Sequence, residues 1–278
     1  MFRRQAIARA SGGICLLAGA HGRAQSKPLQ LGVLPHLSAR LILTNYQPLR
    51  SHLEKELKRP VEISTAANFK EYQARSVAGD YDLMITAPNL ARVAQLDAAL
   101  PAMAICEPPI PGLLVMLKQR PVRQIEELRG KAVAAANPQS LVVLKGMHWL
   151  KARQLVVGQD FKLVRAANED SLAQLLKSGD APLAMMSMGE FRSIQGDLRN
   201  EIEIFSEFAK VPGFIILAKL GMPASQVETL RTTLLRLVDT DEGAQLKTLT
   251  GIAKIRPILD DDLRSLDDVA DETRALMK

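Results

Sequence analysis

Cysteine and histidine are scarce in this chain of 278 residues, and their scarcity excludes several kinds of site. There are two cysteines and four histidines, and no spacing among them matches a zinc site or a Cys–His catalytic pair. The chain also lacks the Gly-x-Ser-x-Gly elbow, the His-Glu-x-x-His helix, the P-loop and the Gly-x-Gly-x-x-Gly turn. We therefore predict that the protein is not an enzyme and uses no metal and no cofactor. Cys106, in the apolar run PAMAIC, is expected to be a buried thiol without a disulfide partner.

A long apolar run is also missing, and the one short run lies close to the N-terminus. Residues 1–24 place three arginines in the first nine positions, then a short apolar stretch, then small residues at Gly22 and Ala24. This is the pattern of a cleaved export signal, and its apolar part is too short to span a bilayer. We predict a signal peptide over residues 1–24 and a mature protein in the periplasm. Arg3-Arg4 leaves the twin-arginine export route open.

Concentrated basic charge is absent once this leader is set aside. The whole chain has 36 Lys and Arg, 30 Asp and Glu, and a net charge of +6. The leader holds four arginines and no acidic residue, so the mature chain has a net charge of about +2. No basic tract of the kind that binds nucleic acid remains, and we expect no nucleic-acid partner.

Short β-like runs alternate with helical patterns along the rest of the chain. The first cycle has its expected strands at residues 29–35, 61–66, 82–87 and 100–107. A Pro-rich break, CEPPIPG, precedes a second cycle that starts at residues 112–118 and ends with the apolar run 211–219. Only helices are expected after residue 219. This alternation predicts an α/β protein with mostly parallel sheets flanked by helices.

Two α/β cycles and a helical tail predict a two-lobed molecule. The tail is too small for a domain and is expected to pack on the first lobe, so that the chain crosses between lobes near 108–118 and near 208–219. The expected domains are then a first lobe of residues 25–112 and 218–278 and a second lobe of residues 113–217. Two lobes joined by two crossings are typical of binding proteins that close about a hinge.

The order of short motifs resembles that of the phosphate/phosphite/phosphonate-type substrate-binding proteins of ABC transporters. The similar segments are Tyr46-Gln47-Pro48-Leu49, Gly79-Asp80-Tyr81-Asp82, the run QIEELRGKAV at 124–133, LLKSGD at 175–180, and Thr240-Asp241-Glu242-Gly243 with Ile255-Arg256-Pro257. Each motif is weak alone, but they follow one another in order over nearly the whole mature chain. The resemblance implies a type II periplasmic-binding-protein-like fold and capture of a small, anionic ligand between two lobes. It also implies delivery to the membrane permease of an ABC transporter; we expect the protein to be a monomer.

Ligands of two-lobed α/β proteins bind at the carboxyl ends of the strands, between the lobes. Polar residues expected at strand ends, together with Tyr46 of the first motif, make up the candidate ligand-binding set. The set is His36, Ser38, Tyr46, Thr86, Asn89, Asn137, Gln139, Ser140 and Ser187. In the family that the chain resembles, the turn at Asn137–Ser140 continues with further hydroxyl residues, whereas here Leu141, Val142 and Val143 follow.

Several alternatives stay open at this point. Ser140 could contact a ligand or could only cap the helix that follows it, since Ser is among the commonest N-caps. His52, expected on the exposed side of a helix, and His148, beside Trp149, are interpreted as structural. A sensory component that signals to a membrane receptor, or less favourably an enzyme on the same scaffold, would have the same motifs.

Overall fold

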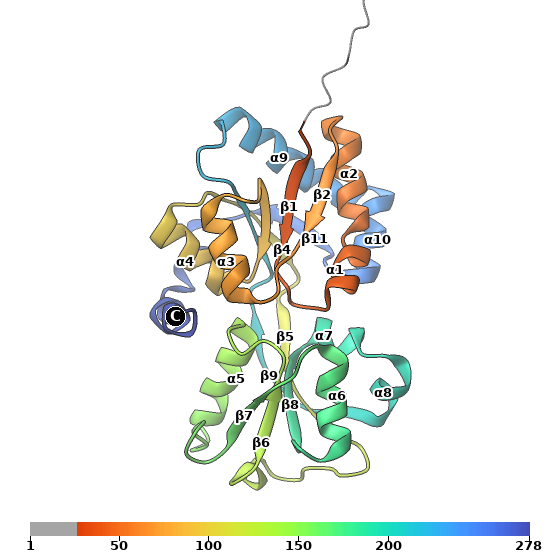
Figure 1. The fold of residues 1–278 in the computed structure, drawn as a ribbon, viewed down its shortest axis with the longest axis vertical. Coiled ribbons are helices and arrows are strands. Elements are labelled where there is room, and N and C mark those ends of the chain that lie inside the picture. The colour runs from red at the N-terminus through yellow and green to blue at the C-terminus, as the bar shows by residue number, and fades with distance from the viewer. Residues whose placement is uncertain (1–26) are drawn as a thin grey trace, which may run out of the picture.

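Two separate sheets organise residues 27–278, the part of the chain that the computed structural model describes (Figure 1). Each sheet carries its own helices, and the two bodies are stacked along the long axis of the molecule. We call the six-stranded body the first body and the five-stranded body the second body. The predicted signal peptide, residues 1–24, lies outside the described residues. None of the helices in residues 27–278 is long and apolar enough to cross a membrane.

The first body is built on a mixed sheet in the order β11-β4-β10-β3-β1-β2. Strand β1 runs parallel to β2 and β3, whereas β10 and β11 run antiparallel to their neighbours. The strands are β1 (Leu29–Val33), β2 (Val61–Ser64), β3 (Leu83–Thr86), β4 (Ala102–Glu107), β10 (Ile215–Ala218) and β11 (Lys254–Pro257). The helices are α1 (Ala39–Asn45), α2 (Gln47–Leu57), α3 (Phe69–Ala78), α4 (Pro88–Ala98), α9 (Ala224–Arg236), α10 (Asp241–Thr250), α11 (Asp260–Arg264) and α12 (Ala270–Leu276).

The second body is built on a mixed sheet in the order β7-β6-β8-β5-β9. Its strands are β5 (Ile110–Leu117), β6 (Ala132–Ala135), β7 (Lys162–Arg165), β8 (Leu183–Ser187) and β9 (Ile202–Val211). Its helices are α5 (Leu141–Lys151), α6 (Glu169–Ser178), α7 (Met188–Ser193) and α8 (Gly196–Glu201). The α/β prediction is confirmed, but both sheets are mixed rather than mostly parallel. The chain enters or leaves the second body through β5 and β9, and these two strands pair antiparallel with each other.

The chain passes between the bodies twice. The first passage joins β4 to β5 and the second joins β9 to β10 (Figure 1). They lie side by side at the level of the Cys106 backbone, whose N–H donates to the carbonyl oxygen of Phe214 over 2.8 Å. Only glycine fits at position 213 without a shift of the backbone, because a Cβ atom there would overlap the Cys106 carbonyl oxygen.

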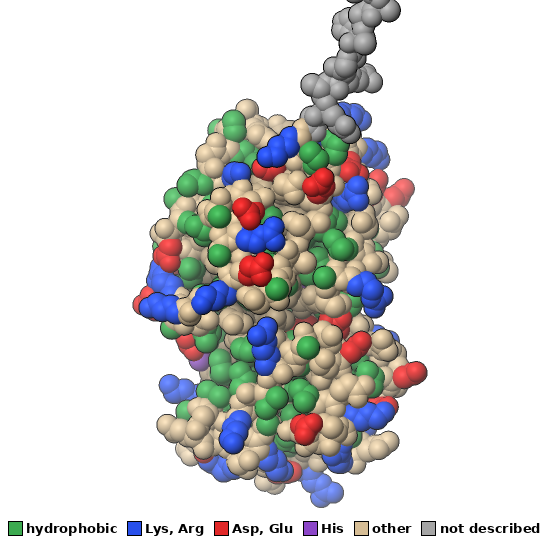
Figure 2. Space-filling view, in the orientation of Figure 1, with side chains coloured by type: hydrophobic (Ala, Val, Ile, Leu, Met, Phe, Trp, Pro, Cys, Tyr) green, Lys and Arg blue, Asp and Glu red, His purple; other side chains and the backbone are tan. Residues whose placement is uncertain are grey.

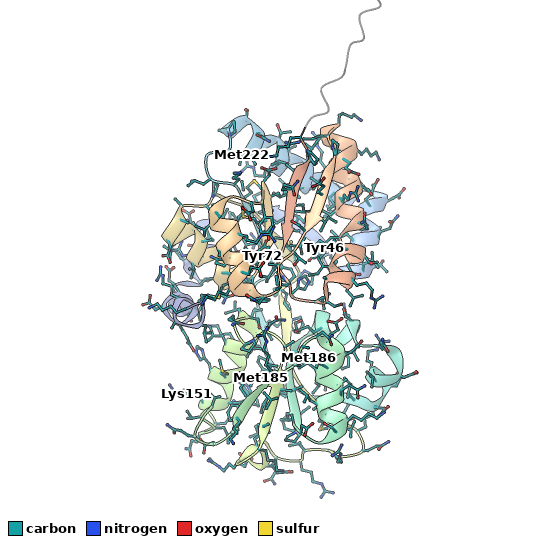
Figure 3. The ribbon with its side chains drawn as sticks, in the orientation of Figure 1. Tyr46, Tyr72, Lys151, Met185, Met186 and Met222 are labelled. Carbon is teal, nitrogen blue, oxygen red and sulfur yellow. The ribbon has the colours of Figure 1, made fainter. Side chains whose placement is uncertain are left out.

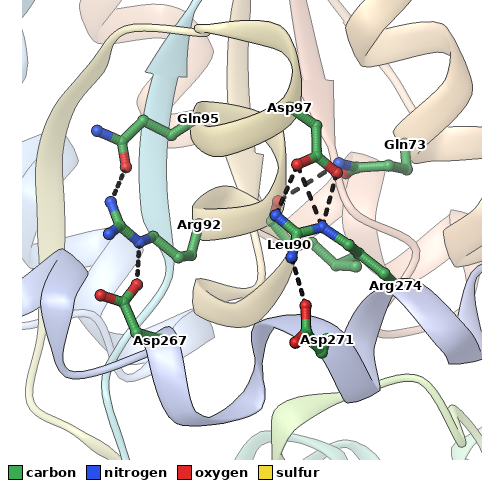
Figure 4. Close-up of polar contacts among 8 residues, drawn as sticks. All are labelled: Gln73, Leu90, Arg92, Gln95, Asp97, Asp267, Asp271 and Arg274. Atoms are coloured by element: carbon green, nitrogen blue, oxygen red, sulfur yellow. Dashed lines mark hydrogen bonds and ion pairs between the residues drawn. The ribbon is translucent and has the colours of Figure 1, made fainter.

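The C-terminal tail is not purely helical, which corrects the sequence expectation. Strand β11 forms an edge of the first sheet and pairs antiparallel with β4, Ile255 opposite Cys106. Only Ile255 of this four-residue strand is buried, so its hydrophobic pattern was too short to indicate a strand. Beyond it, α12 and the turn before it are attached to α4 (Figure 4) by Arg274–Asp97 and Arg92–Asp267 ion pairs, both 2.6 Å long.

Buried aromatic and aliphatic side chains hold each body together. Tyr46 and Tyr72 lie inside the first body, and Met185 and Met186 lie at the centre of the second, on β8 (Figure 3). His52 was expected on the exposed side of its helix, and this was wrong. It is 2% exposed, and its Nε2 lies 2.9 Å from the carbonyl oxygen of Thr233 on α9. Packing of α9 against α2 covers a helix face that looked free in the sequence.

Candidate functional site

A cavity of about 370 Å³ lies between the two bodies, beside both chain passages. The first body contributes His36, which follows β1, and Tyr46, while Phe214 comes from the second passage. The second body contributes Ser140 at the start of α5 and Ser187 at the end of β8. Strand ends from both bodies therefore meet at one cavity, whose size is in the range usual for small-molecule sites.

Apolar side chains form most of the cavity wall. Pro108 and Ile110 come from the first chain passage, and Leu141 and Val142 stand at the start of α5. Met188 adds a thioether from the start of α7. Burial of hydrocarbon is favourable by about 25 cal/mol per Å² of apolar surface. The wall thus favours a ligand with an apolar part.

Two serines at this cavity are helix caps. Ser140 Oγ accepts a hydrogen bond from Val143 N–H over 3.2 Å, and Ser187 Oγ accepts one from Glu190 N–H over 3.1 Å. Both satisfy N–H groups that a helix start leaves without partners. The Ser140 hydroxyl proton stays available for a ligand, so capping and ligand contact are compatible at this residue.

His36 is an uncharged hydrogen-bond acceptor toward the cavity. Its Nδ1 lies 2.9 Å from the Leu34 carbonyl oxygen, which can only accept, so Nδ1 carries the proton and Nε2 is free to accept. The ring packs on Phe214 with a centroid distance of 4.6 Å and meets the edge of Tyr46 at 6.0 Å. Burial lowers the pKa of His36 to about 4, although the Leu34 hydrogen bond opposes this. The imidazole is therefore neutral at physiological pH.

Glu190 is a buried carboxylate in the cavity wall that sequence reasoning did not single out. Its Oε2 accepts hydrogen bonds from Ser187 N–H over 2.7 Å and from Ser187 Oγ–H over 2.8 Å. Asn137 Nδ2 approaches Oε1 at 3.5 Å. Burial raises the pKa of Glu190, and the bonds from Ser187 and Asn137 act against this. The spacing Ser187-x-x-Glu190 is a capping box, a sequence signal that could have revealed this carboxylate.

A second, smaller cavity of about 200 Å³ adjoins the first at His36, Leu37 and Asn137. At its wall Ser38, from the first body, donates to Glu169 at the start of α6. The Ser38 Oγ–H···Oε1 distance is 2.8 Å and the N–H···Oε2 distance is 3.1 Å. These bonds connect the bodies directly and use both donors of Ser38.

The structure brings together most of the predicted site residues, but not all of them. His36, Tyr46, Asn137, Ser140 and Ser187 line the larger cavity, and His36, Ser38 and Asn137 line the smaller one. Thr86, Asn89 and Gln139 line neither. A role in ligand binding stays a prediction for the whole set.

Asn89 and Thr86 lie deeper than a strand-end position suggested. Asn89 is 0% exposed, and its Nδ2 donates to the Gln139 carbonyl oxygen and to Thr273 Oγ1, each over 3.2 Å. It therefore connects the first body, the second body and the tail. Thr86 is 2% exposed, and it lies opposite Ile215 where β3 pairs with β10.

Charge of one sign does not gather on the face of the molecule that Figure 2 shows. Lys and Arg alternate with Asp and Glu over the face that Figure 2 shows. Within residues 27–278, no three His, Cys, Asp or Glu side chains are grouped so that they could hold a metal ion. His148, interpreted as structural, pairs with Glu272 of the tail over 2.8 Å. The cavities between the bodies are thus the candidate ligand site.

Solved structures with the same fold cover nearly the whole chain. A binding protein component of an ABC phosphonate transporter from Pseudomonas aeruginosa aligns with a TM-score of 0.78 at 14% identity, over 91% of this chain and 89% of that one. PhnD1 from Prochlorococcus marinus, in complex with methylphosphonate, aligns with a TM-score of 0.76 at 12% identity, over 89% and 98%. The periplasmic aliphatic sulphonate binding protein SsuA from Escherichia coli aligns with a TM-score of 0.65 at 12% identity, over 91% and 94%. These similarities confirm the two-lobed periplasmic-binding-protein fold.

Comparison of sequences gives the family. No curated protein sequence matches the chain significantly. The family described as "ABC transporter, phosphonate, periplasmic substrate-binding protein" matches residues 31–263, which is most of the chain. Its members are substrate-binding components of transport systems, not enzymes, and they act in the periplasm. The chain therefore belongs to the family of periplasmic substrate-binding proteins of phosphonate ABC transporters.

Proposed function

We propose that this protein captures a small organic solute in the cavity between its bodies and delivers it to the permease of an ABC transporter. The observation that carries this proposal is the cavity of about 370 Å³, whose wall comes from both bodies and both chain passages. A ligand in that position contacts both bodies at once and so stabilises their closed arrangement. The family match supports delivery to a permease.

The two chain passages, within 108–118 and 208–219, act as the hinge in this proposal. The moving lobes are the two bodies, so the expected bounds, residues 25–112 with 218–278 and residues 113–217, shift by a few residues. Strand β5 moves with the second body from Ile110, and β10 moves with the first body from Ile215. The signal peptide at residues 1–24 would direct export and be cleaved in the process, and the mature protein would act as a monomer without catalysis.

Oxyanions are the first ligand class to consider, because the relatives above include proteins named for phosphonate and sulphonate. One feature of this chain also supports an anion. Helix α5 starts at the cavity, and of its first three N–H groups only that of Val143 is bonded to the Ser140 side chain. Such helix starts attract negative charge. The phosphonate class therefore has to be tested directly.

Small-angle scattering tests the closing mechanism. The mature protein is first screened by thermal shift against phosphonates, sulphonates, carboxylates and amines, because a ligand at 100 times its Kd stabilises by about 2.7 kcal/mol. Scattering is then measured with and without the compound that binds. We expect a smaller radius of gyration at saturation, and an unchanged radius would contradict closure.

A further inference from the structure

The larger cavity holds hydrogen-bond donors that no group of the described chain uses. Tyr46 lines this cavity and is 0% exposed, and within residues 27–278 its hydroxyl has no hydrogen-bond partner. At the start of α5, the N–H groups of Leu141 and Val142 also lack a partner in this part of the chain, and the Ser140 hydroxyl proton is free. Buried donors without partners are costly, so a ligand that accepts hydrogen bonds would satisfy these groups.

The charges around this cavity favour an anionic group at the start of α5. The helix start carries partial positive charge, and the exposed cations Arg192 and Lys210 in the cavity lining attract an anion from solution. Glu190 is a negative group in the same wall, and its carboxylate accepts hydrogen bonds from Ser187 and Asn137. Because like charges repel, we expect the anionic group of a ligand at α5 and its uncharged part beside α7, the helix that carries Glu190.

The rest of the wall is suited to hydrocarbon. Leu141 and Val142 occupy the first two positions of α5, Phe214 comes from the second chain passage, and Met188 begins α7. Leu249, near the end of α10, also lines the cavity and is 43% exposed, which is high for a large apolar side chain. An aliphatic chain against these residues would remove hydrocarbon from water on both sides of the contact. The one carbon of methylphosphonate, the ligand in the PhnD1 structure, is too short to cover them.

From these contacts we propose that the solute is an amphipathic anion. Its charged group lies at the start of α5, and a hydrocarbon part of several carbons lies against Met188 and Phe214. The cavity of about 370 Å³ is large enough for such a ligand. The proposal rests on the proposed function, since it names the class of solute that the two bodies would enclose. It goes beyond the family match because the hydrocarbon part, and not the head group alone, determines which anion this chain prefers.

Probes that differ in one part at a time test the proposal by calorimetry on the mature protein. Methylphosphonate and hexylphosphonate share a head group, whereas hexylamine and hexanol share the hydrocarbon part of hexylphosphonate. Each buried methylene improves the Kd about fourfold, so we expect hexylphosphonate to bind at least about a hundredfold more tightly than methylphosphonate. It should also bind at least about tenfold more tightly than hexylamine and hexanol, which lack the negative charge. A gain of less than about tenfold over methylphosphonate, or equal binding of hexylamine or hexanol, would overturn the proposal.

Ser140→Gly tests the position of the anionic group. Glycine is tolerated at a helix N-cap, so the variant largely keeps the stability of α5 and removes only the hydroxyl donor. We expect both phosphonates to bind at least about tenfold more weakly, since a hydrogen bond to a charged group is lost. The ratio of the two affinities should not change. Native affinity for both phosphonates would show that the anionic group does not lie at α5.

Met188→Ala tests the position of the hydrocarbon part. Met188 is half-buried, and its truncation should weaken binding of hexylphosphonate by at least about fourfold while methylphosphonate keeps its native affinity. Unchanged methylphosphonate binding also shows that the variant is folded. The control is Met222→Ala, because Met222 is likewise half-buried, lines neither cavity and lies in the first body, far from the second (Figure 3). It should alter neither affinity. An equal loss for both phosphonates in Met188→Ala, or no loss for either, would contradict a hydrocarbon part at α7.

Scattering with the same probes separates this inference from the proposed function. Compaction by methylphosphonate, with no gain in affinity from the longer chain, overturns the amphipathic anion and retains the closing solute receptor. Tight binding of hexylphosphonate that depends on Met188 but leaves the radius of gyration unchanged retains the amphipathic anion and contradicts closure.

Discussion

At the scale of single residues, the cleft places ionisable groups where water is scarce. His36 is held neutral by burial, and Glu190 is held in the cavity wall by the Ser187 cap. The protonation of each group therefore differs between the folded and the unfolded chain, and stability must depend on pH. The two groups act in opposite directions, because burial lowers the pKa of the histidine and raises that of the carboxyl.

We predict that His36 lowers the stability of the folded protein in mild acid. In the unfolded chain His36 takes up a proton near its ordinary pKa of 6.5, whereas in the folded protein it does so only near pH 4. The free energy of unfolding therefore keeps its full value with respect to this residue above pH 6.5. It falls by up to about 3 kcal/mol as the pH drops toward 4. Urea denaturation of native protein and His36→Gln between pH 4 and 7 measures this. The variant should lose less stability on acidification, and parallel curves would contradict the prediction.

At the scale of elements, the two chain passages require close approach of backbones. Strand β4 ends where the β9–β10 connection begins, and Gly213 lies against the Cys106 carbonyl group. A side chain there meets backbone, which cannot rotate away as a side chain can. The Pro212-Gly213 pair in the sequence therefore indicates a place where two backbone segments pack closely, as well as a turn.

Gly213→Ala is predicted to destabilise the protein by about 1–3 kcal/mol, because the added methyl group must push the passages apart. Gly196→Ala is the control, since a Cβ atom at Gly196, the first residue of α8, has nothing within 4 Å. Urea denaturation should show a lower midpoint for Gly213→Ala and a native or slightly higher one for Gly196→Ala. A native midpoint for Gly213→Ala would contradict the tight fit.

At the scale of the whole molecule, the tail of the first body reaches the second body. Lys145 and His148 on α5 pair with Asp268 and Glu272 of the tail, over 2.9 Å and 2.8 Å. These pairs are partly exposed, whereas the Asn89 side chain bonds to the Gln139 carbonyl oxygen in the buried interior. Exposed ion pairs contribute little, so the buried amide is the stronger connection between the bodies.

Asn89→Ala is predicted to cost about 1–3 kcal/mol, because it removes the donor to Gln139 and Thr273 and leaves an empty, polar-lined space. His148→Ala, which removes an exposed connection between the same bodies, should cost at most about 1 kcal/mol. Thermal and urea denaturation give both values, and scattering should show a larger radius of gyration for Asn89→Ala. A cost for His148→Ala equal to that of Asn89→Ala would contradict this ranking.

Much of this protein was determined by local sequence. The alternation of β-like and helical runs predicted the α/β class, and Pro-Gly breaks indicated where the chain passes between the sheets, because turn chemistry and periodicity are local properties. Ser140 was expected at a helix start for the same reason, and it caps α5 at the cavity. Ser187 was expected at a strand end, and it ends β8 and also caps α7. The ordered motifs indicated the family that the chain belongs to.

Only the tertiary structure decided which polar groups are free. Ser38 looks like a ligand donor in the sequence, but Glu169, which lies 131 residues away in the chain, accepts its hydrogen bonds. Asn89 was expected at the cleft, and the tail covers it through Thr273, 184 residues away. The strand β11 and the buried His52 likewise depend on segments far along the chain. Burial and hydrogen-bond partners depend on such distant contacts. The local sequence pattern therefore located the cleft, whereas the packing of distant segments decided which of its polar groups are buried and already hydrogen-bonded.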